Sequence, residues 1–325
     1  MIEVKHFFLE VICAILALTA FSSSLHAQPF PNKPITILHV TPAGGTTNTI
    51  MLLLGDKIAQ GLGQKVINEA RPGGNGNIAA LALMRAPSDG YTLMTTHSSL
   101  LTTFPLLSKA QFDPKKDFKP VTPYVTNTGF VYVSAESKLK SIAELVALSK
   151  AKPGGLLTGV SAGVINESVV LFKMATQAEM TSVPYKGSVQ ALNDLAGGRL
   201  DLFFANMQAG KPFVDSGRVK VLAATTAQRA ETLPDIPTMV DLGYPDVVTN
   251  TWFGLFAPSG TPDSVVRIIQ REVSKALTDP KVRESLLGLG LMPNGASPEE
   301  FEKVLAVDYV RAAKLVKESG IKPDI

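Results

Sequence analysis

The fold class is indicated by Ile35-Thr36-Ile37-Leu38-His39-Val40, which is followed at once by Thr41-Pro42-Ala43-Gly44-Gly45. Its first part is mostly apolar and β-branched, which predicts a short strand, and the Pro and paired Gly residues predict a turn. Asn48 or Thr47 is placed to cap a helix over residues 49–60. One face of this helix would be apolar, carrying Ile50, Leu53, Leu54 and Ile58. A strand, a glycine-rich turn and a helix in this order indicate an α/β unit.

The same alternation continues along the chain. We expect strands at residues 35–40, 65–68, 91–95, 129–133, 156–160, 181–185, 200–204, 219–224 and 252–257. We expect helices at residues 49–60, 78–85, 141–150, 166–177, 188–196, 262–277, 280–289 and 298–319. This rhythm favours parallel α/β sheets. The simplest architecture is two α/β units joined by extended crossings near residues 114–126 and 249–256.

Composition excludes several classes of protein. The chain has 325 residues, of which 45% are hydrophobic and 18% charged, so a disordered chain is excluded. Its 26 Gly and 22 Pro show no period, which excludes collagen. The formal net charge is only +3, and charges of both signs are interspersed, so no nucleic-acid stripe is indicated. The length leaves room for two domains with cores of their own.

The N-terminus has the pattern of an export signal. Lys5 and His6 precede an apolar run over residues 11–21, and small polar residues then lead to Ala27 and Gln28. We expect a signal peptide over residues 1–27, cleaved after Ala27, and a periplasmic mature protein. The apolar run is too short for a membrane span, which needs about 20 residues. The alternative is an amphipathic or buried N-terminal helix.

The single Cys lies within this expected signal peptide. Cys13 sits in the middle of the apolar run, and Glu10 stands where a lipoprotein signal would carry Leu, so a lipid anchor is disfavoured. Residues 28–325 contain no Cys. Thiol catalysis, thiolate metal ligands and disulfides are therefore unavailable to the mature chain.

The turn at residues 41–48 is the first candidate binding site. Glycine lets a ligand approach the backbone closely, and a helix N-terminus exposes N–H groups that suit an anion. The loop matches neither the P-loop nor the dinucleotide-binding pattern, and it contains no Lys or Arg. A carboxylate is therefore at least as plausible a ligand as a phosphate. The alternative is a tight turn needed only for packing.

The sequence Gly159-Val160-Ser161-Ala162-Gly163 matches the G-x-S-x-G pattern of a nucleophile elbow between an expected strand and helix. A serine hydrolase using Ser161 is the corresponding enzyme hypothesis. In that fold the catalytic His follows the Ser, and this chain has no His after Ser161. The four His residues are His6, His26, His39 and His97. A second ligand-binding loop is therefore the better interpretation.

His97 ends the third expected strand within the polar run Thr95–Ser99, at the sheet edge where ligands bind in α/β folds. A ligand-facing His97 and a merely solvated one are both open. His39 lies in an apolar strand and is expected to be a core residue, as is Trp252. The spacing of His, Asp and Glu gives no zinc or calcium motif, so we expect neither a metal nor a cofactor.

A series of motifs then appears in a fixed order along the mature chain. They are Pro42–Gly45, Glu69–Ile78, Pro87–Leu93, Asp113–Phe118, Val183–Gly187, Asp194–Asp201 and Trp252–Pro262. With them the chain resembles the Bug family, the extracytoplasmic solute-binding proteins of tripartite tricarboxylate transporters. The resemblance covers nearly all of residues 28–325.

This resemblance implies a two-lobed type II periplasmic-binding-protein fold, in which each lobe is a mixed, mainly parallel sheet flanked by helices. Lobe 1 would comprise residues 28–124 and 251–325, and lobe 2 residues 125–250. A small carboxylate would bind between the lobes and be delivered to a membrane permease, without any reaction and with the receptor working as a monomer. The resemblance implies ligand contacts by Ala43, Gly44, Gly45, Thr46, Asn48, Thr96, His97, Ser98, Ser161, Ala162, Gly163, Ala205 and Asn206.

The chain departs from the family pattern at several of these positions. Asn48 and Ala205 stand where the family usually has Asp, Thr41 replaces a usual aromatic residue, and the loop at 161–168 is shorter than usual. Losing two acidic groups removes partners for an ammonium group. We therefore expect a mono- or dicarboxylate ligand without an amino group, with aromatic acids included. A ligand sensor that presents its closed form to a membrane receptor stays open as an alternative to transport.

Overall fold

The computed structural model describes residues 30–319, apart from residues 45, 109, 161–163, 186 and 250. The expected signal peptide therefore lies outside the described residues. The described residues from Lys33 onward belong to one compact unit. None of the described helices is long and apolar enough to cross a membrane.

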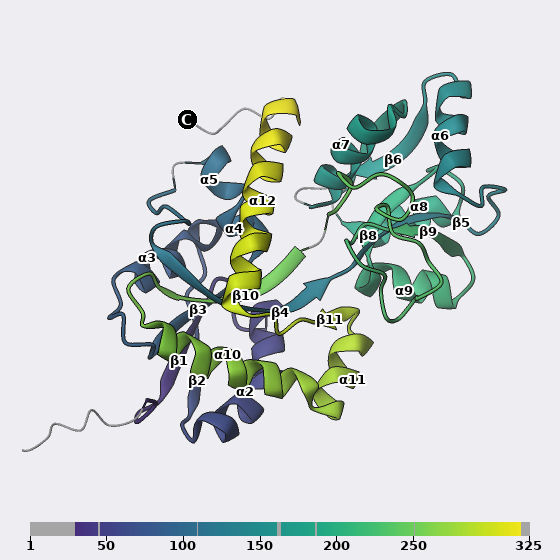
Figure 1. The fold of residues 1–325 in the computed structure, drawn as a ribbon. Coiled ribbons are helices and arrows are strands. Elements are labelled where there is room, and N and C mark those ends of the chain that lie inside the picture. Colours follow the sequence, from purple (N-terminus) through teal and green to yellow (C-terminus); the bar gives the residue numbers. More distant parts are fainter. Residues whose placement is uncertain are drawn as a thin grey trace, which may run out of the picture. The chain divides into compact units, whose positions relative to one another are not determined.

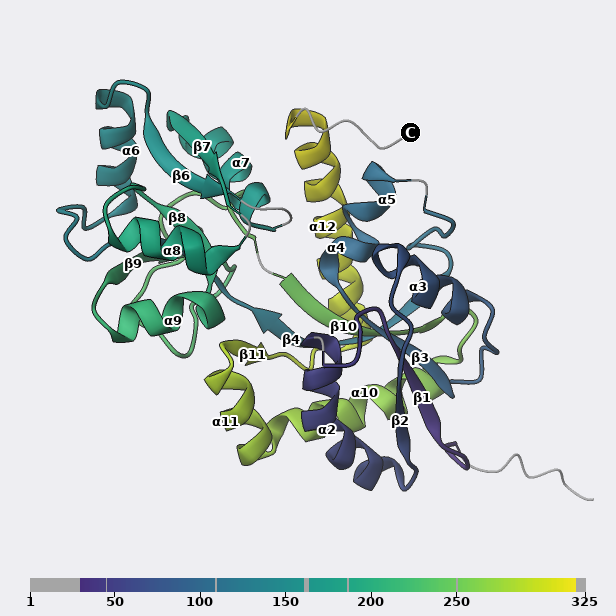
Figure 2. The same ribbon diagram turned by 180° about the vertical axis from the view of Figure 1, so that it is seen from behind.

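The larger sheet has six strands in the order β11-β4-β10-β3-β1-β2 (Figures 1 and 2). These strands are β1 (Ile35–His39), β2 (Val66–Ala70), β3 (Thr92–His97), β4 (Phe118–Asn127), β10 (Thr251–Pro258) and β11 (Leu291–Pro293). β1 pairs in parallel with both β2 and β3, as the strand–turn–helix alternation predicts. β10 is antiparallel to β3 and β4, and β11 is antiparallel to β4.

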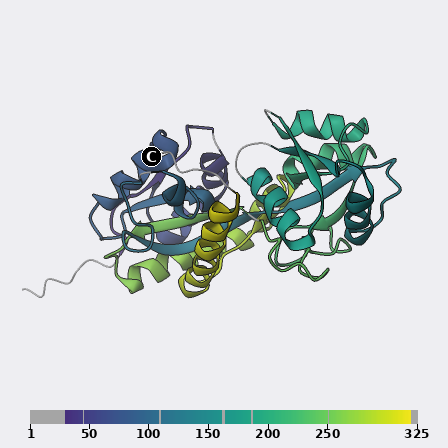
Figure 3. The ribbon, with the colours of Figure 1, turned by 90° about the horizontal axis from the view of Figure 1, so that it is seen from above.

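The mixed α/β fold is thus confirmed. Contrary to expectation, parallel pairing does not dominate this sheet. β4 leads directly into the first strand of a second sheet, and β10 brings the chain back (Figure 3). A strand that brings the chain back runs against its neighbours, so β10 introduces antiparallel pairs on both of its sides. The segment at 114–126, expected as a plain crossing, is mostly this ten-residue strand β4.

Helices cover the larger sheet, and an aromatic cluster fills its core. The helical elements are α2 (Thr46–Leu62), η1 (Gly74–Gly76), α3 (Asn77–Met84), α4 (Ser98–Leu101), α5 (Phe104–Leu107), α10 (Asp263–Thr278), α11 (Pro280–Gly288) and α12 (Pro298–Ser319). Trp252 packs edge-on against Phe301 of α12, with ring centroids 4.9 Å apart, and its Nε1 donates to Asp308 Oδ2 at 2.7 Å. The expected core position of Trp252 is confirmed.

The remaining strands form two further groups. β5 (Gly129–Ser134) pairs antiparallel with both β8 (Phe203–Asn206) and β9 (Val219–Ala224). β6 (Leu156–Val160) and β7 (Met180–Pro184) form a parallel pair, and a single parallel bridge from Thr158 to Leu202 links β6 to the end of the segment before β8. Their helices are α6 (Ile142–Ala151), α7 (Val164–Thr176), α8 (Ser188–Ala196) and α9 (Met207–Asp215).

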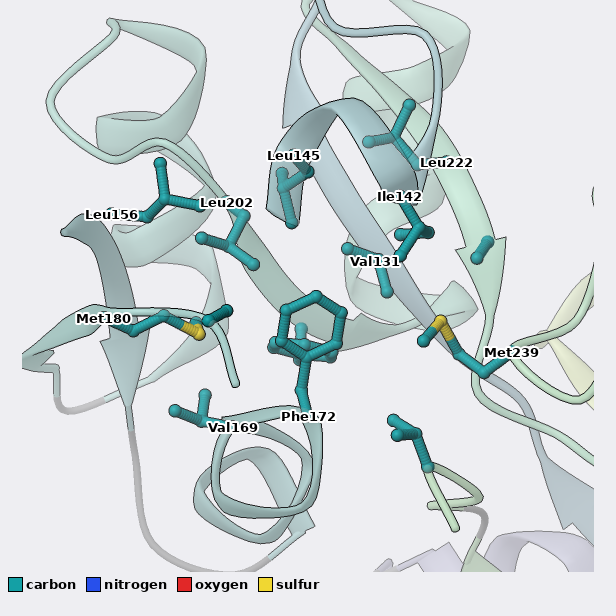
Figure 4. Packing of buried hydrophobic residues seen from close by; sticks show 14 of the residues in the cluster. Val131, Ile142, Leu145, Leu156, Val169, Phe172, Met180, Leu202, Leu222 and Met239 are labelled. Atoms are coloured by element: carbon teal, nitrogen blue, oxygen red, sulfur yellow. The ribbon is translucent and has the colours of Figure 1, made fainter. Parts of the chain in front are cut away.

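Phe172 of α7 lies at the centre of the apolar core between these strands and helices (Figure 4). It is fully buried and meets Phe204 of β8 edge-on at 5.5 Å. Helix α9 escaped prediction because Pro212 lies inside it and normally argues against a helix. Here Pro212 falls in the second turn of a nine-residue helix, and Asn206 caps the N-terminus.

Helix α6 begins with a reciprocal capping arrangement. Ser141 Oγ accepts from the Glu144 amide at 3.1 Å, and the Glu144 carboxylate accepts from the Lys140 amide at 2.6 Å. We expect Ser141→Ala to lower the free energy of unfolding by about 1 kcal/mol, because an N–H of the first turn loses its acceptor. Urea unfolding measures this difference. Ser141→Asp keeps an acceptor and should stay near wild type; equal losses in both variants would contradict the capping role.

Candidate functional site

The first candidate loop follows β1 and is held by a partly buried chain of hydrogen bonds. Thr47 Oγ1 lies 2.7 Å from Thr41 Oγ1 and 3.3 Å from His39 Nδ1, while His39 Nε2 lies 2.9 Å from Asn68 Oδ1. Burial lowers the pKa of His39, and the hydrogen bond to Asn68 acts in the opposite direction. Both ring nitrogens are therefore engaged within the fold, and the prediction that His39 is a core residue is confirmed.

The capping prediction for this loop is wrong. α2 begins at Thr46, so Thr47 and Asn48 both lie inside its first turn. Thr47 is buried against the β1 end, and Asn48 Oδ1 reaches back to accept from the Gly44 amide at 3.1 Å. Gly44 has φ +79°, a conformation that glycine adopts without strain. Ala43, Gly44 and Thr46 are exposed, so a ligand can reach this loop, but the Gly44 N–H is already bonded to Asn48.

The second candidate loop follows β3 at the same edge of the sheet. β1 and β3 are parallel neighbours in register from Thr36↔Thr92 to His39↔Thr95, so the loops after them emerge side by side. His97 is half-buried, its Nδ1 lies 2.8 Å from Ser99 Oγ, and burial lowers its pKa. Thr96 is fully buried and Ser98 nearly so. An imidazole that is neutral at pH 7 offers one donor and one acceptor rather than a positive charge.

Ala205 and Asn206 occupy the end of β8. Ala205 is only 4% exposed, and Asn206 Oδ1 accepts from the Ala209 amide at 2.9 Å as the cap of α9. Both line a cavity of about 70 Å³, whose other lining residues are Asn127, Gly129, Phe130, Ser168, Phe204, Thr225, Thr249 and Thr251. The cavity is lined by residues from both crossings between the sheets. None of the described residues that line it is charged.

The cavity is rich in polar groups that the sequence analysis did not single out. Ser168 Oγ lies 2.7 Å from Thr249 Oγ1, and Thr225 Oγ1 donates to the Thr249 carbonyl at 3.1 Å. Asn127 Oδ1 is buried and has no hydrogen-bond partner among the described residues. A buried amide oxygen in this state attracts a donor, from water or from a ligand. Asn127 and Thr249 lie beside the two crossings expected near 114–126 and 249–256, which is a signal that could have found them. Ser168 and Thr225 lie beside neither crossing, and the sequence carries no signal for them.

Four candidate residues, Gly45, Ser161, Ala162 and Gly163, lie outside the described residues. The structure brings Ala43, Gly44, Thr46 and Asn48 to the same sheet edge as Thr96, His97 and Ser98, and it places Ala205 with Asn206 in the cavity. Within the described part of the chain, no three His, Cys, Asp or Glu side chains gather as a possible metal site.

Comparison with known proteins identifies the relatives of this chain. Residues 50–321 match the family described as "Tripartite tricarboxylate transporter family receptor". BugT of Bordetella pertussis is 31% identical over 321 residues, covering 97% of this chain and 98% of BugT. The solved structure of Rhodopseudomonas palustris Rpa4515 with adipate shares 33% identity, with a TM-score of 0.69 and coverage of 90% and 99%. MatC of the same organism, solved with bound malate, shares 27% identity, with a TM-score of 0.65 and coverage of 88% and 100%.

The solved periplasmic binding protein BugD shares 27% identity, with a TM-score of 0.64 and coverage of 90% and 99%. The fold and these relatives define a two-lobed α/β solute-binding protein of the periplasmic-binding-protein class. The chain belongs to the receptor family of tripartite tricarboxylate transporters, the family of the Bug proteins.

Proposed function

We propose that this protein captures a small organic carboxylate between its two lobes and delivers it to a tripartite tricarboxylate-type membrane permease. Lobe 1 would comprise residues 28–124 and 251–325, and lobe 2 residues 125–250. The proposal includes export to the periplasm with cleavage after Ala27, and no chemical reaction. Family membership supports it, as do the adipate and malate named for two solved relatives.

The chemistry of the candidate loops suits a carboxylate held by uncharged donors. The described parts of the β1–α2 and β3–α4 loops carry no Lys or Arg, and neither does the cavity lining. Backbone N–H groups at a helix N-terminus, hydroxyls and amides can satisfy a carboxylate without a counter-charge. The observation that carries the proposal is this set of neutral donors at sheet edges in a member of a carboxylate-receptor family.

Binding of one ligand by both lobes would produce the signal that a permease reads. Contacts made only in the closed form shift the population toward that form. In this mechanism Gly44 and Thr46 belong to one lobe, and Ser161, Gly163 and Asn206 approach from the other.

We infer that the ligand carries no amino group. The side-chain oxygen of Asn48 already accepts a hydrogen bond from the Gly44 amide, and the side chain of Ala205 in the cavity is only a methyl group. A ligand ammonium would find no carboxylate partner at either position. Adipate-like and malate-like acids fit this inference, and so do aromatic monocarboxylates.

Mass spectrometry of the denatured, freshly purified protein should reveal any retained molecule, which we expect to be an acid without an amine. Isothermal titration with adipate, malate, benzoate and glutamate then compares the classes directly. Adipate, malate or benzoate should bind in a 1:1 complex, and glutamate should bind much more weakly. Tight binding of glutamate alone would overturn the amine-free ligand.

Pull-down of membrane proteins with and without the bound acid tests delivery to a permease, because a closed-form receptor should retain its permease only with ligand present.

A further inference from the structure

A groove on the larger sheet, separate from the candidate ligand loops, has the size and chemistry of a small-molecule site. It has a volume of about 570 Å³ and lies between α12 and the segment that leads into β4. Ligand sites for small molecules generally measure about 300–1,000 Å³. β4 enters at Phe118 and β10 ends at Pro258, so the groove lies at the end of these strands opposite Asn127.

The floor and one wall of the groove are apolar. Phe118 and Phe256 are buried beneath it, and α12 contributes Leu305, Ala306 and Tyr309. Val310 at its margin is 72% exposed, although valine on a soluble helix more commonly packs inward. An apolar body placed in this groove would cover surface that now contacts water.

Three lysines line the opposite side, and two of them form ion pairs with described residues. Lys116 pairs with Asp113 at 3.1 Å, and Lys119 pairs with Asp263 and donates to the Thr261 carbonyl at 2.9 Å. Lys115 Nζ instead lies 4.7 Å from the centre of the Tyr309 ring. Among the described residues, no carboxylate forms an ion pair with Lys115. The groove therefore places a free cation against an aromatic wall.

We propose that this groove binds an amphipathic organic monoanion, with its apolar body over Phe118, Phe256 and Tyr309 and its anionic head at Lys115. The acidic residue of the lining, Glu302, stands on α12 and disfavours the reverse orientation. The groove offers a positive charge beside an apolar floor, and this arrangement complements a ligand with an anionic head and an apolar body. This site is independent of the proposed interlobe ligand.

Octanoate and the fluorescent sulfonate 8-anilinonaphthalene-1-sulfonate are suitable probes. We expect the sulfonate to bind one site with a rise in fluorescence, and octanoate to displace it better than the neutral 1-octanol. Ala306→Trp should weaken both probes at least tenfold because the indole fills the groove. Val307→Trp is the matched control, since Val307 is a neighbouring, 56% exposed residue that does not line the groove. It should bind like wild type.

A second comparison tests the role of the positive charge. It sets Lys115→Gln against Lys303→Gln, because Lys303 is a lysine of α12 outside the groove. Only Lys115→Gln should weaken octanoate, by up to about fivefold, and it should leave octanol unchanged. Circular dichroism confirms that each variant is folded. Unchanged probe binding in Ala306→Trp, or equal losses in Val307→Trp, would overturn the site. A preference for octanol over octanoate would overturn the anionic class and indicate an apolar protein-docking surface instead.

Discussion

Replacing Ala205 with Asp is expected to weaken binding of the proposed amine-free carboxylate at least a hundredfold, because such a ligand has no ammonium group to pair with the new charge. Ala205 is 4% exposed and lines the cavity at the end of β8, where water cannot screen a new charge fully. Two negative charges about 5 Å apart repel by about 3 kcal/mol at an effective dielectric constant of about 20. That energy corresponds to more than a hundredfold in affinity. Isothermal titration with the retained acid measures the loss.

Ala205→Asn is the matched control for this prediction. Asn has nearly the size of Asp but no charge, so it separates repulsion from crowding of the cavity. We expect Ala205→Asn to keep most of the affinity, with thermal unfolding confirming that both variants are folded. Equal losses in the two variants would show that volume, not charge, decides. Tighter binding of an amino acid by Ala205→Asp than by wild type would show that this position can recognise an ammonium group.

Local sequence patterns predicted the elements of this fold well where the signal is itself local. The strand at Ile35, the glycine-rich turn and the following helix are all present, because strand propensity, turn chemistry and amphipathic spacing agree there. The helix nonetheless begins at Thr46, before both expected caps. The Thr47 hydroxyl instead lies 2.7 Å from Thr41 Oγ1 and 3.3 Å from His39 Nδ1, and helix-capping rules do not contain such tertiary contacts.

The polar cavity shows why part of the candidate site could not be predicted. Ser168 and Thr249 are 81 positions apart in the chain, yet their hydroxyls lie 2.7 Å apart. Asn127 joins them because β4 ends at the crossing, and β4 itself was expected only as an extended connection. Each of these residues alone is an ordinary polar residue. Their meeting depends on how two crossings pass between the sheets, which periodicity along the chain does not report.

Glu167→Gln is expected to stabilise the protein at alkaline pH by about 3 kcal/mol. Burial raises the pKa of Glu167, in the first turn of α7, to about 7; among its charged neighbours on α12, Arg311 lowers this pKa and Asp308 raises it. The Asp308 carboxylate itself accepts hydrogen bonds from Trp252 Nε1 at 2.7 Å and from Arg311 at 2.8 Å. Arg311 is thus shared between two carboxylates, and its positive charge does not offset the cost of burying an ionised Glu167.

The direction of the pH effect follows from proton binding. Below about pH 4.5, the ordinary value, folded and unfolded chains both hold the Glu167 proton. Between about pH 4.5 and 7 the unfolded chain releases this proton first, so stability falls as pH rises through this window. A shift of this size corresponds to about 3 kcal/mol once both states are ionised. Because Gln mimics the protonated acid, its advantage over wild type should grow from about 1 kcal/mol near pH 5 to about 3 kcal/mol at pH 8.

Urea unfolding at pH 5 and pH 8 measures this change, with Glu179→Gln as the control at an exposed carboxylate. Glu179→Gln should give nearly the same difference from wild type at both pH values. If Glu167→Gln instead destabilises the protein at pH 8, the ionised Glu167 must be held by Arg311 more strongly than Asp308 and burial oppose it. That outcome would make Glu167 and Arg311 a stabilising ion pair between α7 and α12. The sign of the stability difference between Glu167→Gln and wild type at pH 8 therefore decides whether ionised Glu167 weakens or stabilises the contact between these two helices.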